Sequence, residues 1–250
     1  MNKTIDNTEL FSGKSNFYAA SRPAYPAGAI EWLRNNTTAQ RVADIGAGTG
    51  IFTELLLPHF QKVCAVEPNL DMFNKFREAL PEIPIHLARG EKTSLPPRSV
   101  ELITVAQAFH WLDEELFKSE AMRILSPGGQ VAIVWNNRTA EGIAPARDAV
   151  CQKYCTRFSK GHAGKRSPAE GDHFLRYEYF KSVKYFSCPN YFYMDQEQFI
   201  SNVRSRSYAL TETDEKFDDF MDEINAVFSE FAVNGVVCEV YNTEIFLGTF

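Results

Sequence analysis

Three glycines spaced two apart, Gly46, Gly48 and Gly50, constrain the fold of this chain more than any other feature. They follow the apolar run 41–45 and lead into a helical pattern at 49–60. Glycine lets the backbone turn tightly and approach a ligand closely, because it has no Cβ. The first turn of a helix also offers free N–H groups to an electron-rich group. This order of strand, glycine turn and helix predicts a ligand-binding loop on an α/β sheet.

Strands and helices are predicted to alternate through the middle of the chain. Five short apolar runs, typical of buried strands, lie at 41–46, 62–67, 83–88, 100–107 and 130–135. Apolar residues at helical spacing predict helices at 49–60, 69–80 and 113–125. In the last of these helices, Leu116, Met122 and Leu125 are predicted to face inward. The alternation indicates βαβ units and a parallel sheet with helices on both faces.

The C-terminal part is less regular. Two further strands are predicted at 182–194 and 236–250, with helices at 197–210 and 214–232 between them. Region 139–182 is rich in charges, and its stretch 159–172, SKGHAGKRSPAEGD, is interpreted as an exposed loop. The predicted fold is therefore α/β, with a Rossmann-like, doubly wound, mostly parallel seven-stranded sheet, an N-terminal extension and a C-terminal elaboration.

Composition limits the class of protein and its partners. The hydrophobic fraction is 44% and the charged fraction 23%, as in ordinary globular domains. The net charge of −6 argues against tight nucleic-acid binding, which needs a basic face. No apolar run is long enough for a signal peptide or a membrane span, so we expect no membrane partner. Five irregularly spaced cysteines predict neither a disulfide framework nor a metal site, and favour a cytoplasmic location.

Two acids accompany the glycine turn. Asp44 precedes it, and Glu67 ends the second predicted strand, where a carboxylate can accept hydrogen bonds from ribose hydroxyls. Nicotinamide dehydrogenases carry a further glycine three residues after the second one, and that position is Ile51 here. The pattern therefore disfavours a nicotinamide cofactor.

The string DIGAGTG at 44–50 and the acid in AVEPN at 65–69 resemble the first two motifs of the class I methyltransferases that use S-adenosylmethionine (SAM). The resemblance implies that the glycines frame the methionine part of SAM, Asp44 organises the loop and Glu67 holds the ribose, with Asn69 and Met72 beside the adenine. The cofactor-binding residues that it implies are Asp44, Gly46, Ala47, Gly48, Gly50, Glu67, Pro68, Asn69, Met72, Gly90, Glu91 and Ala106.

The expected adenine segment departs from the family pattern. Arg89 stands where relatives often carry an acid that receives the adenine amino group. Backbone groups of Gly90 are an alternative partner for adenine. Glu91 is open to two interpretations, as a functional residue or as a loop residue.

Three further strings, AQAFHW at 106–111, RPAYP at 22–26 and SRSY at 205–208, resemble the methyltransferase type 11 group, which includes trans-aconitate methyltransferase-like proteins. The acceptor should lie beyond the carboxyl end of the fourth strand. His110 is the candidate catalytic base, and its alternatives are a pocket wall or a structural residue. Phe109 either flanks the acceptor or belongs to the core. The candidate substrate-binding residues are Tyr18, Arg22, Tyr25, His110, Trp111, Asn136 and Arg204.

The sequence is therefore interpreted as one methyltransferase domain, 1–250. It comprises an N-terminal extension at 1–40, of which 10–27 form a lid, a SAM-binding core at 41–138 and a C-terminal elaboration at 139–250. The expected reaction methylates a small molecule and yields S-adenosylhomocysteine. A carboxylate acceptor is one candidate, because Arg22, Arg138, Arg204 and Arg206 fall near the expected crevice. A non-catalytic SAM-binding protein and a methyltransferase acting on a macromolecule are the alternatives. The pattern does not predict an oligomeric state.

Overall fold

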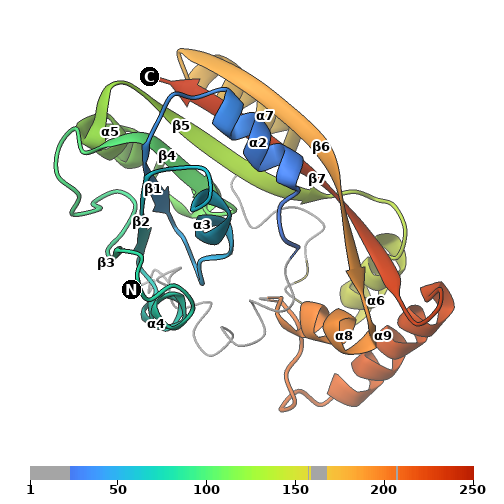
Figure 1. Ribbon diagram of the computed structural model, residues 1–250. Coiled ribbons are helices and arrows are strands. Elements are labelled where there is room, and N and C mark those ends of the chain that lie inside the picture. The colour runs from blue at the N-terminus through green and yellow to red at the C-terminus, as the bar shows by residue number, and fades with distance from the viewer. Residues whose placement is uncertain (1–22, 157, 159–167, 207) are drawn as a thin grey trace, which may run out of the picture.

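A seven-stranded sheet forms the frame of the computed structural model, which describes residues 23–156, 158, 168–206 and 208–250 (Figure 1). The strands stand in the order β3-β2-β1-β4-β5-β7-β6. Their bounds are β1 Arg41–Ile45, β2 Lys62–Glu67, β3 Ile85–Leu87, β4 Val100–Ala106, β5 Leu125–Arg138, β6 Ser182–Met194 and β7 Val237–Thr249. The first five are parallel, and β7 runs antiparallel between β5 and β6. The predicted mostly parallel seven-stranded sheet is confirmed.

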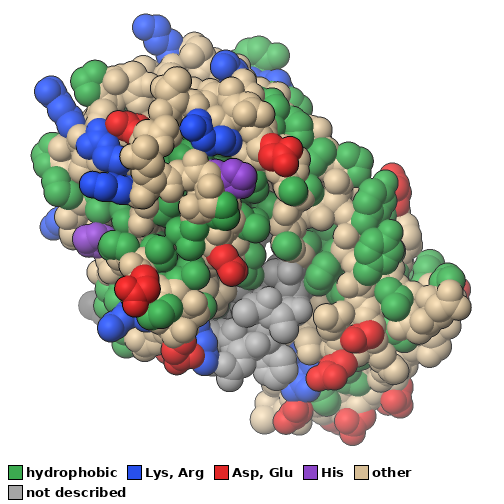
Figure 2. Space-filling model, viewed as in Figure 1, with side chains coloured by type: hydrophobic (Ala, Val, Ile, Leu, Met, Phe, Trp, Pro, Cys, Tyr) green, Lys and Arg blue, Asp and Glu red, His purple; other side chains and the backbone are tan. Residues whose placement is uncertain are grey.

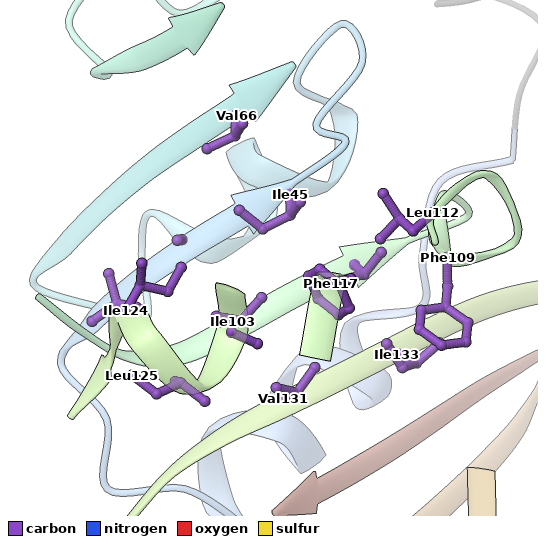
Figure 3. Close-up of a cluster of buried hydrophobic side chains, with 14 of the residues drawn as sticks. Ile45, Val66, Ile103, Phe109, Leu112, Phe117, Ile124, Leu125, Val131 and Ile133 are labelled. Carbon is purple, nitrogen blue, oxygen red and sulfur yellow. The ribbon is translucent and has the colours of Figure 1, made fainter. Parts of the chain in front are cut away.

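Helices cover both faces of this sheet. Their bounds are α2 Ala27–Asn35, α3 Ile51–Leu56, α4 Leu70–Ala79, α5 Glu114–Ile124 and α7 Pro168–Phe174, followed by a π-helical turn, Leu175–Tyr179. Leu33 of α2 and Phe52 of α3 pack on one face. Phe117 and Ile124 of α5 pack on the other face, against Ile103 of β4 (Figure 3). Burial on both faces explains why the central strands are continuous apolar runs.

A second group of helices forms what we call the C-terminal lobe, at the lower right of Figure 1. It consists of α6 Ala144–Tyr154, α8 Gln196–Arg204 and α9 Phe217–Phe231, packed on the outer ends of β6 and β7. Phe199, Phe220 and Ile224 are fully buried in its core, together with Met194 at the end of β6. The lobe therefore has a hydrophobic centre of its own while sharing two strands with the sheet.

Three local predictions were wrong in whole or in part. Of the stretch 159–172, expected to be an exposed loop, residues 159–167 lie outside the described part of the chain, and residues 168–172 belong to α7. Leu116 and Met122 are exposed, because α5 turns Phe117 and its neighbours inward instead. The fifth strand, expected at 130–135, begins already at Leu125, and its pairing has a register irregularity opposite the start of β4.

The charges on the molecule are unevenly distributed. Figure 2 shows acidic side chains gathered over the C-terminal lobe, while Lys and Arg side chains lie mostly at the opposite end of the same face. Exposed Asp218, Asp219 and Asp222 of α9 contribute to the acidic side. None of the helices in the described part of the chain is long and apolar enough to cross a membrane.

Candidate active site

The glycine turn between β1 and α3 adopts a backbone that favours glycine at three positions. Gly46, Gly48 and Gly50 have φ angles of 71°, 59° and 96°, in the left-handed region. A Cβ on Gly46 would lie 2.5 Å from the Cβ of Ala108, and one on Gly50 would lie 2.8 Å from Leu80. A Cβ on Gly48 would meet nothing within 4 Å. Two of the glycines are therefore required by packing, while Gly48 faces open space, as a ligand-binding backbone should.

Glu67 fastens this loop to the end of β2. Its two carboxylate oxygens accept hydrogen bonds from the backbone N–H of Gly48 (2.8 Å) and of Asn69 (2.9 Å). The side chain is only 6% exposed, and burial raises its pKa above the usual value, although both hydrogen bonds oppose the rise. A carboxylate can accept about four hydrogen bonds, so two remain for ligand hydroxyls. Its assignment to ribose stays a prediction that this geometry supports.

Asp44 lies beneath the loop. It is 1% exposed, and it accepts hydrogen bonds from the hydroxyls of Thr53 on α3 (2.6 Å) and Thr104 on β4 (2.7 Å). Burial raises its pKa to about 6, although both hydroxyls lower it. Asp44 thus joins β1, α3 and β4 and supports the loop through its neighbours. We interpret it as a positioning residue, because both of its oxygens are bonded to side chains of the fold.

Thr49 is a site residue that the sequence analysis missed. It stands between Gly48 and Gly50, is 7% exposed, and its hydroxyl has no hydrogen-bond partner. A buried hydroxyl without a partner costs about 1–3 kcal/mol. A ligand oxygen held at the loop would remove this cost, so the residues present fit a bound cofactor. Only its position within the motif could have pointed to Thr49.

The residues expected near adenine mostly have structural contacts. Asn69 caps α4 by accepting a hydrogen bond from the N–H of Met72, which is buried (3.0 Å). A Cβ on Gly90 would lie 2.8 Å from Leu112, so close packing requires glycine there. Glu91 accepts a hydrogen bond from the N–H of Asp113 (2.9 Å), which favours its interpretation as a loop residue.

Two residues that flank this region are largely turned away from the core. Arg89 is exposed, and its Nε lies 3.9 Å from a carboxylate oxygen of Glu91. Pro68, between Glu67 and the α4 cap, is half-buried. How the adenine is held stays a prediction.

The turn after β4 presents aromatic rings. Phe109 of the 3-10 helix Phe109–Trp111 points into the core towards Ile133 (Figure 3), which settles it as a core residue. His110 lies between Trp111 and Trp135, with ring centroids 4.6 Å and 5.3 Å away. This stacking supports the interpretation of His110 as part of a pocket wall, and its role as a base stays a prediction.

Gln107 shapes the same turn. Its φ of 56° is unusual for a residue other than glycine. Its N–H donates to the carbonyl of Val134 (2.9 Å), and its side chain donates to the carbonyl of Asn136 (3.1 Å). Gln107 thus ties the end of β4, at Ala106, to β5.

The side chain of Asn136 makes its hydrogen bonds within the protein. Its oxygen accepts hydrogen bonds from Thr243 (2.5 Å) and Asn190 (3.3 Å), and its amide donates to the carbonyls of Pro23 (3.4 Å) and Ala24 (3.5 Å). It therefore attaches the N-terminal segment to three strands. A direct contact with substrate stays a prediction.

The other predicted acceptor residues are scattered. Tyr25 packs edge-on against Phe52, with ring centroids 4.8 Å apart. Arg204 of α8 donates to Glu212 (2.7 Å), a surface pairing that gives no support to its predicted role in substrate binding. Tyr18 and Arg22, with most of the predicted lid, lie outside the described residues.

Comparisons with known proteins agree with this geometry. The type 11 family model described as a methyltransferase domain matches residues 43–133. An uncharacterized methyltransferase of Mycobacterium bovis is 40% identical over 133 residues, 53% of this chain and 54% of the relative. An uncharacterized methyltransferase-like protein of Schizosaccharomyces pombe is 32% identical over 125 residues, 48% of this chain and 49% of the relative. The chain thus matches about half the length of these curated relatives.

A solved structure from Anaeromyxobacter dehalogenans, provisionally named a type II methyltransferase, has the same fold. Its TM-score is 0.67 at 22% identity, covering 91% of this chain and 97% of that one. The family-model match runs from Ala43 on β1 to Ile133 on β5, so it contains the glycine loop, Glu67 and the turn after β4. Residues 43–133 are thus similar to a methyltransferase domain, the curated relatives that match the chain are methyltransferases by name, and the fold is that of a methyltransferase structure.

Proposed function

We propose that the protein transfers the methyl group of SAM to a small-molecule acceptor and releases S-adenosylhomocysteine. One observation carries the proposal: the cofactor loop touches the turn that leads to the aromatic wall. A Cβ on Gly46 would lie 2.5 Å from the Cβ of Ala108, directly before the helix that holds His110 and Trp111. Donor loop and acceptor wall are thus in direct contact, as a transfer between two bound molecules requires.

The side chains of this protein mainly position SAM and the acceptor, and SAM itself supplies the reactive methyl group. When bound, SAM provides a methyl group that its sulfonium already activates. Glu67 orients the ribose, and Thr49 offers its hydroxyl at the turn. Trp111 and Trp135 on either side of His110 exclude water and hold the acceptor for in-line attack. If the acceptor must lose a proton, His110 of this wall is the candidate base, because imidazole as a class titrates near neutrality.

The small-molecule acceptor is supported by charge. The net charge is −6, and the outer face of the C-terminal lobe is acidic, which would repel nucleic acid from that side (Figure 2). A cytoplasmic location, the single-domain organisation and the trans-aconitate-like subtype rest on sequence features alone and stay predictions.

The proposal is tested in two steps. Calorimetry with SAM, S-adenosylhomocysteine and NAD should show binding of the first two alone. Incubation with methyl-labelled SAM and cell extract, followed by size fractionation, should place the label in small molecules. Label mainly in RNA or protein would contradict the acceptor class, and binding of SAM without any transfer would indicate a non-catalytic SAM-binding protein.

A further inference from the structure

Residues 23–26, which we call the strap, connect two parts of the candidate active site. They lie directly before α2 and form neither helix nor strand. Proline at positions 23 and 26 removes the backbone N–H there, so the strap cannot pair as an ordinary strand. Side chains from other elements hold it at both ends.

Two asparagine amides hold the first end of the strap. Asn190 on β6 donates to the carbonyl of Ala24 (2.7 Å). Asn136 on β5 donates to the carbonyls of Pro23 (3.4 Å) and Ala24 (3.5 Å). The bond from Asn190 is the shortest of the three, so this residue makes the strongest contact with the strap.

The orientation of the Asn136 amide is fixed by its neighbours. Its oxygen accepts hydrogen bonds from the hydroxyl of Thr243 on β7 (2.5 Å) and from Asn190 (3.3 Å). Thr243 is fully buried, and Asn136 is only 9% exposed. Because the oxygen faces these two donors, the NH₂ group faces the strap and donates to it.

The same residue is joined to the turn after β4. The backbone carbonyl of Asn136 accepts a hydrogen bond from the side chain of Gln107 (3.1 Å). Gln107 has a φ of 56°, a conformation that persists only where the surroundings fix it. The short helix with His110 and Trp111 begins two residues later. Asn136 thus connects the strap to the acceptor wall.

The other end of the strap contacts the cofactor side. Tyr25 packs edge-on against Phe52 of α3, with ring centroids 4.8 Å apart. Phe52 is 3% exposed, and α3 begins directly after Gly50 of the glycine loop. The strap therefore spans from the helix that follows the cofactor loop to the strands that carry the acceptor wall.

We propose that Asn190 and Asn136 are positioning residues for methyl transfer, because they hold the strap that aligns the glycine loop with the wall formed by His110 and Trp111. This rests on the proposed methyl transfer and adds residues that deepen it. Neither asparagine needs to touch the substrate for this role. A misplacement of about 1 Å at a reacting centre can cost about 100-fold in rate, so the strap acts on the transfer step.

The variant Asn190→Asp loosens the strap with little risk to folding, because the side chain is half-buried on the last strand of the sheet. A carboxylate cannot donate, and it places an oxygen against the carbonyl of Ala24. Helix α2 stays docked on β6, since Trp32 stacks on Phe186 with ring centroids 5.2 Å apart.

In Asn190→Asp, amide hydrogen exchange in residues 23–30 should become faster. The maximal rate of label transfer, measured at saturating SAM with the small-molecule fraction of cell extract, should fall about tenfold or more. The affinity for S-adenosylhomocysteine, measured by calorimetry, should stay within about threefold of the parent, because the glycine loop is unchanged. A merely structural role would lower stability and leave the maximal rate of the folded protein unchanged.

Two further variants serve as controls. Asn190→Gln keeps an amide donor, so its maximal rate should lie nearer to that of the parent than to that of Asn190→Asp. Asn36→Asp makes the same chemical change where the side chain accepts a hydrogen bond from Lys184 of β6 (3.3 Å), outside the strap. Its maximal rate and its exchange in residues 23–30 should equal those of the parent.

A double variant tests whether the two ends act through one strap. Tyr25→Leu removes the ring that packs on Phe52 and should lower the same maximal rate. Once one end is released, the other contributes little, so Asn190→Asp combined with Tyr25→Leu should be about as slow as the slower single variant. Losses that multiply in the double variant would show that the two ends act independently, and would overturn the inference.

Other results also decide against the strap. A parent-like maximal rate or unchanged exchange in Asn190→Asp, or an equal loss of rate in Asn190→Gln, overturns the inference while methyl transfer stands. A large loss of S-adenosylhomocysteine affinity at an unchanged maximal rate does the same. If the parent binds no S-adenosylhomocysteine or labels no small molecule, the proposed function fails and the inference with it.

Discussion

Asp44 has a buried carboxyl group whose titration can be measured as stability. Burial raises its pKa from 3.8 to about 6 in the folded protein. Because one pH unit corresponds to about 1.4 kcal/mol, the shift amounts to roughly 3 kcal/mol. The side chain is 1% exposed, so solvent screening reduces this figure little. The effect is large against a typical free energy of unfolding of about 5–15 kcal/mol.

The sign follows from the raised pKa. Below about pH 4 the group is protonated in the folded and unfolded states, and it costs little. Between about pH 4 and 6 the unfolded chain releases the proton while the folded chain keeps it, so the free energy of unfolding falls as pH rises. Above about pH 6 the folded protein bears the whole cost of roughly 3 kcal/mol.

Asp44→Asn removes this titration and keeps the shape of the side chain. Its amide can still bond the hydroxyls of Thr53 and Thr104, since a hydroxyl both donates and accepts. Urea unfolding at a series of pH values from 4 to 7.5 gives the difference in stability between variant and parent. This difference should change in favour of the variant by up to about 3 kcal/mol as pH rises. Asp218→Asn, on the exposed side of α9, is the control and should follow the parent.

A difference between Asp44→Asn and the parent that is constant with pH would refute the reasoning, because it would show that the buried carboxyl does not titrate in this range. A change in the denaturant slope m would instead signal an altered unfolded or native state, so m should be equal in the two proteins.

Three further predictions concern other contacts of the structure. Glu239→Gln should lower the free energy of unfolding by about 3–5 kcal/mol, measured by urea unfolding, because it leaves the buried guanidinium of Arg147 without its main counter-charge. Equal stability of this variant and the parent would show that the pair is not a buried ion pair. Glu67→Gln should weaken SAM binding by calorimetry about tenfold or more, through loss of a charged acceptor for ribose, and unchanged affinity would remove Glu67 from the ribose site. Thr49→Val should not lower stability and can raise it, because the hydroxyl removed is buried without a partner, yet it should weaken binding of S-adenosylhomocysteine. Thr53→Val should instead lower stability, because Thr53 bonds Asp44 within the fold.

The central part of the fold could be predicted because its signals are local. Strands β1, β2 and β4 and the segment 131–134 of β5 are buried, so their sequences are mostly apolar. The glycine loop could be predicted for a related reason. Gly46, Gly48 and Gly50 take backbone angles that other residues rarely adopt, so the glycine pattern itself predicts the conformation of the loop.

The inward faces of two helices could not be predicted, because each buries a charge. On α5, Glu120 points inward and bonds Thr93 and Arg123, which displaces the predicted apolar face. On α6, Arg147 occupies the buried side and pairs with Glu239 on a strand 92 residues away. Hydrophobic periodicity treats both side chains as solvent-facing. Their burial is tolerable because each is paired, Glu120 with Arg123 and Thr93 and Arg147 with Glu239.

The candidate site shows the same difference between local sequence signals and contacts with distant residues. The predicted glycine loop lies on one short stretch with its own backbone signature, so motif and geometry agree there. The residues predicted to bind the acceptor come from several elements, and the contacts of each depend on what faces it. Asn136 and Arg204 look alike in sequence as polar residues near a crevice, yet one fastens the N-terminal segment and the other pairs with Glu212. Arg206 differs from Arg204 by two positions and is buried beside Glu239. The contacts of these charged side chains therefore depend on partners in other elements, which a linear pattern does not contain.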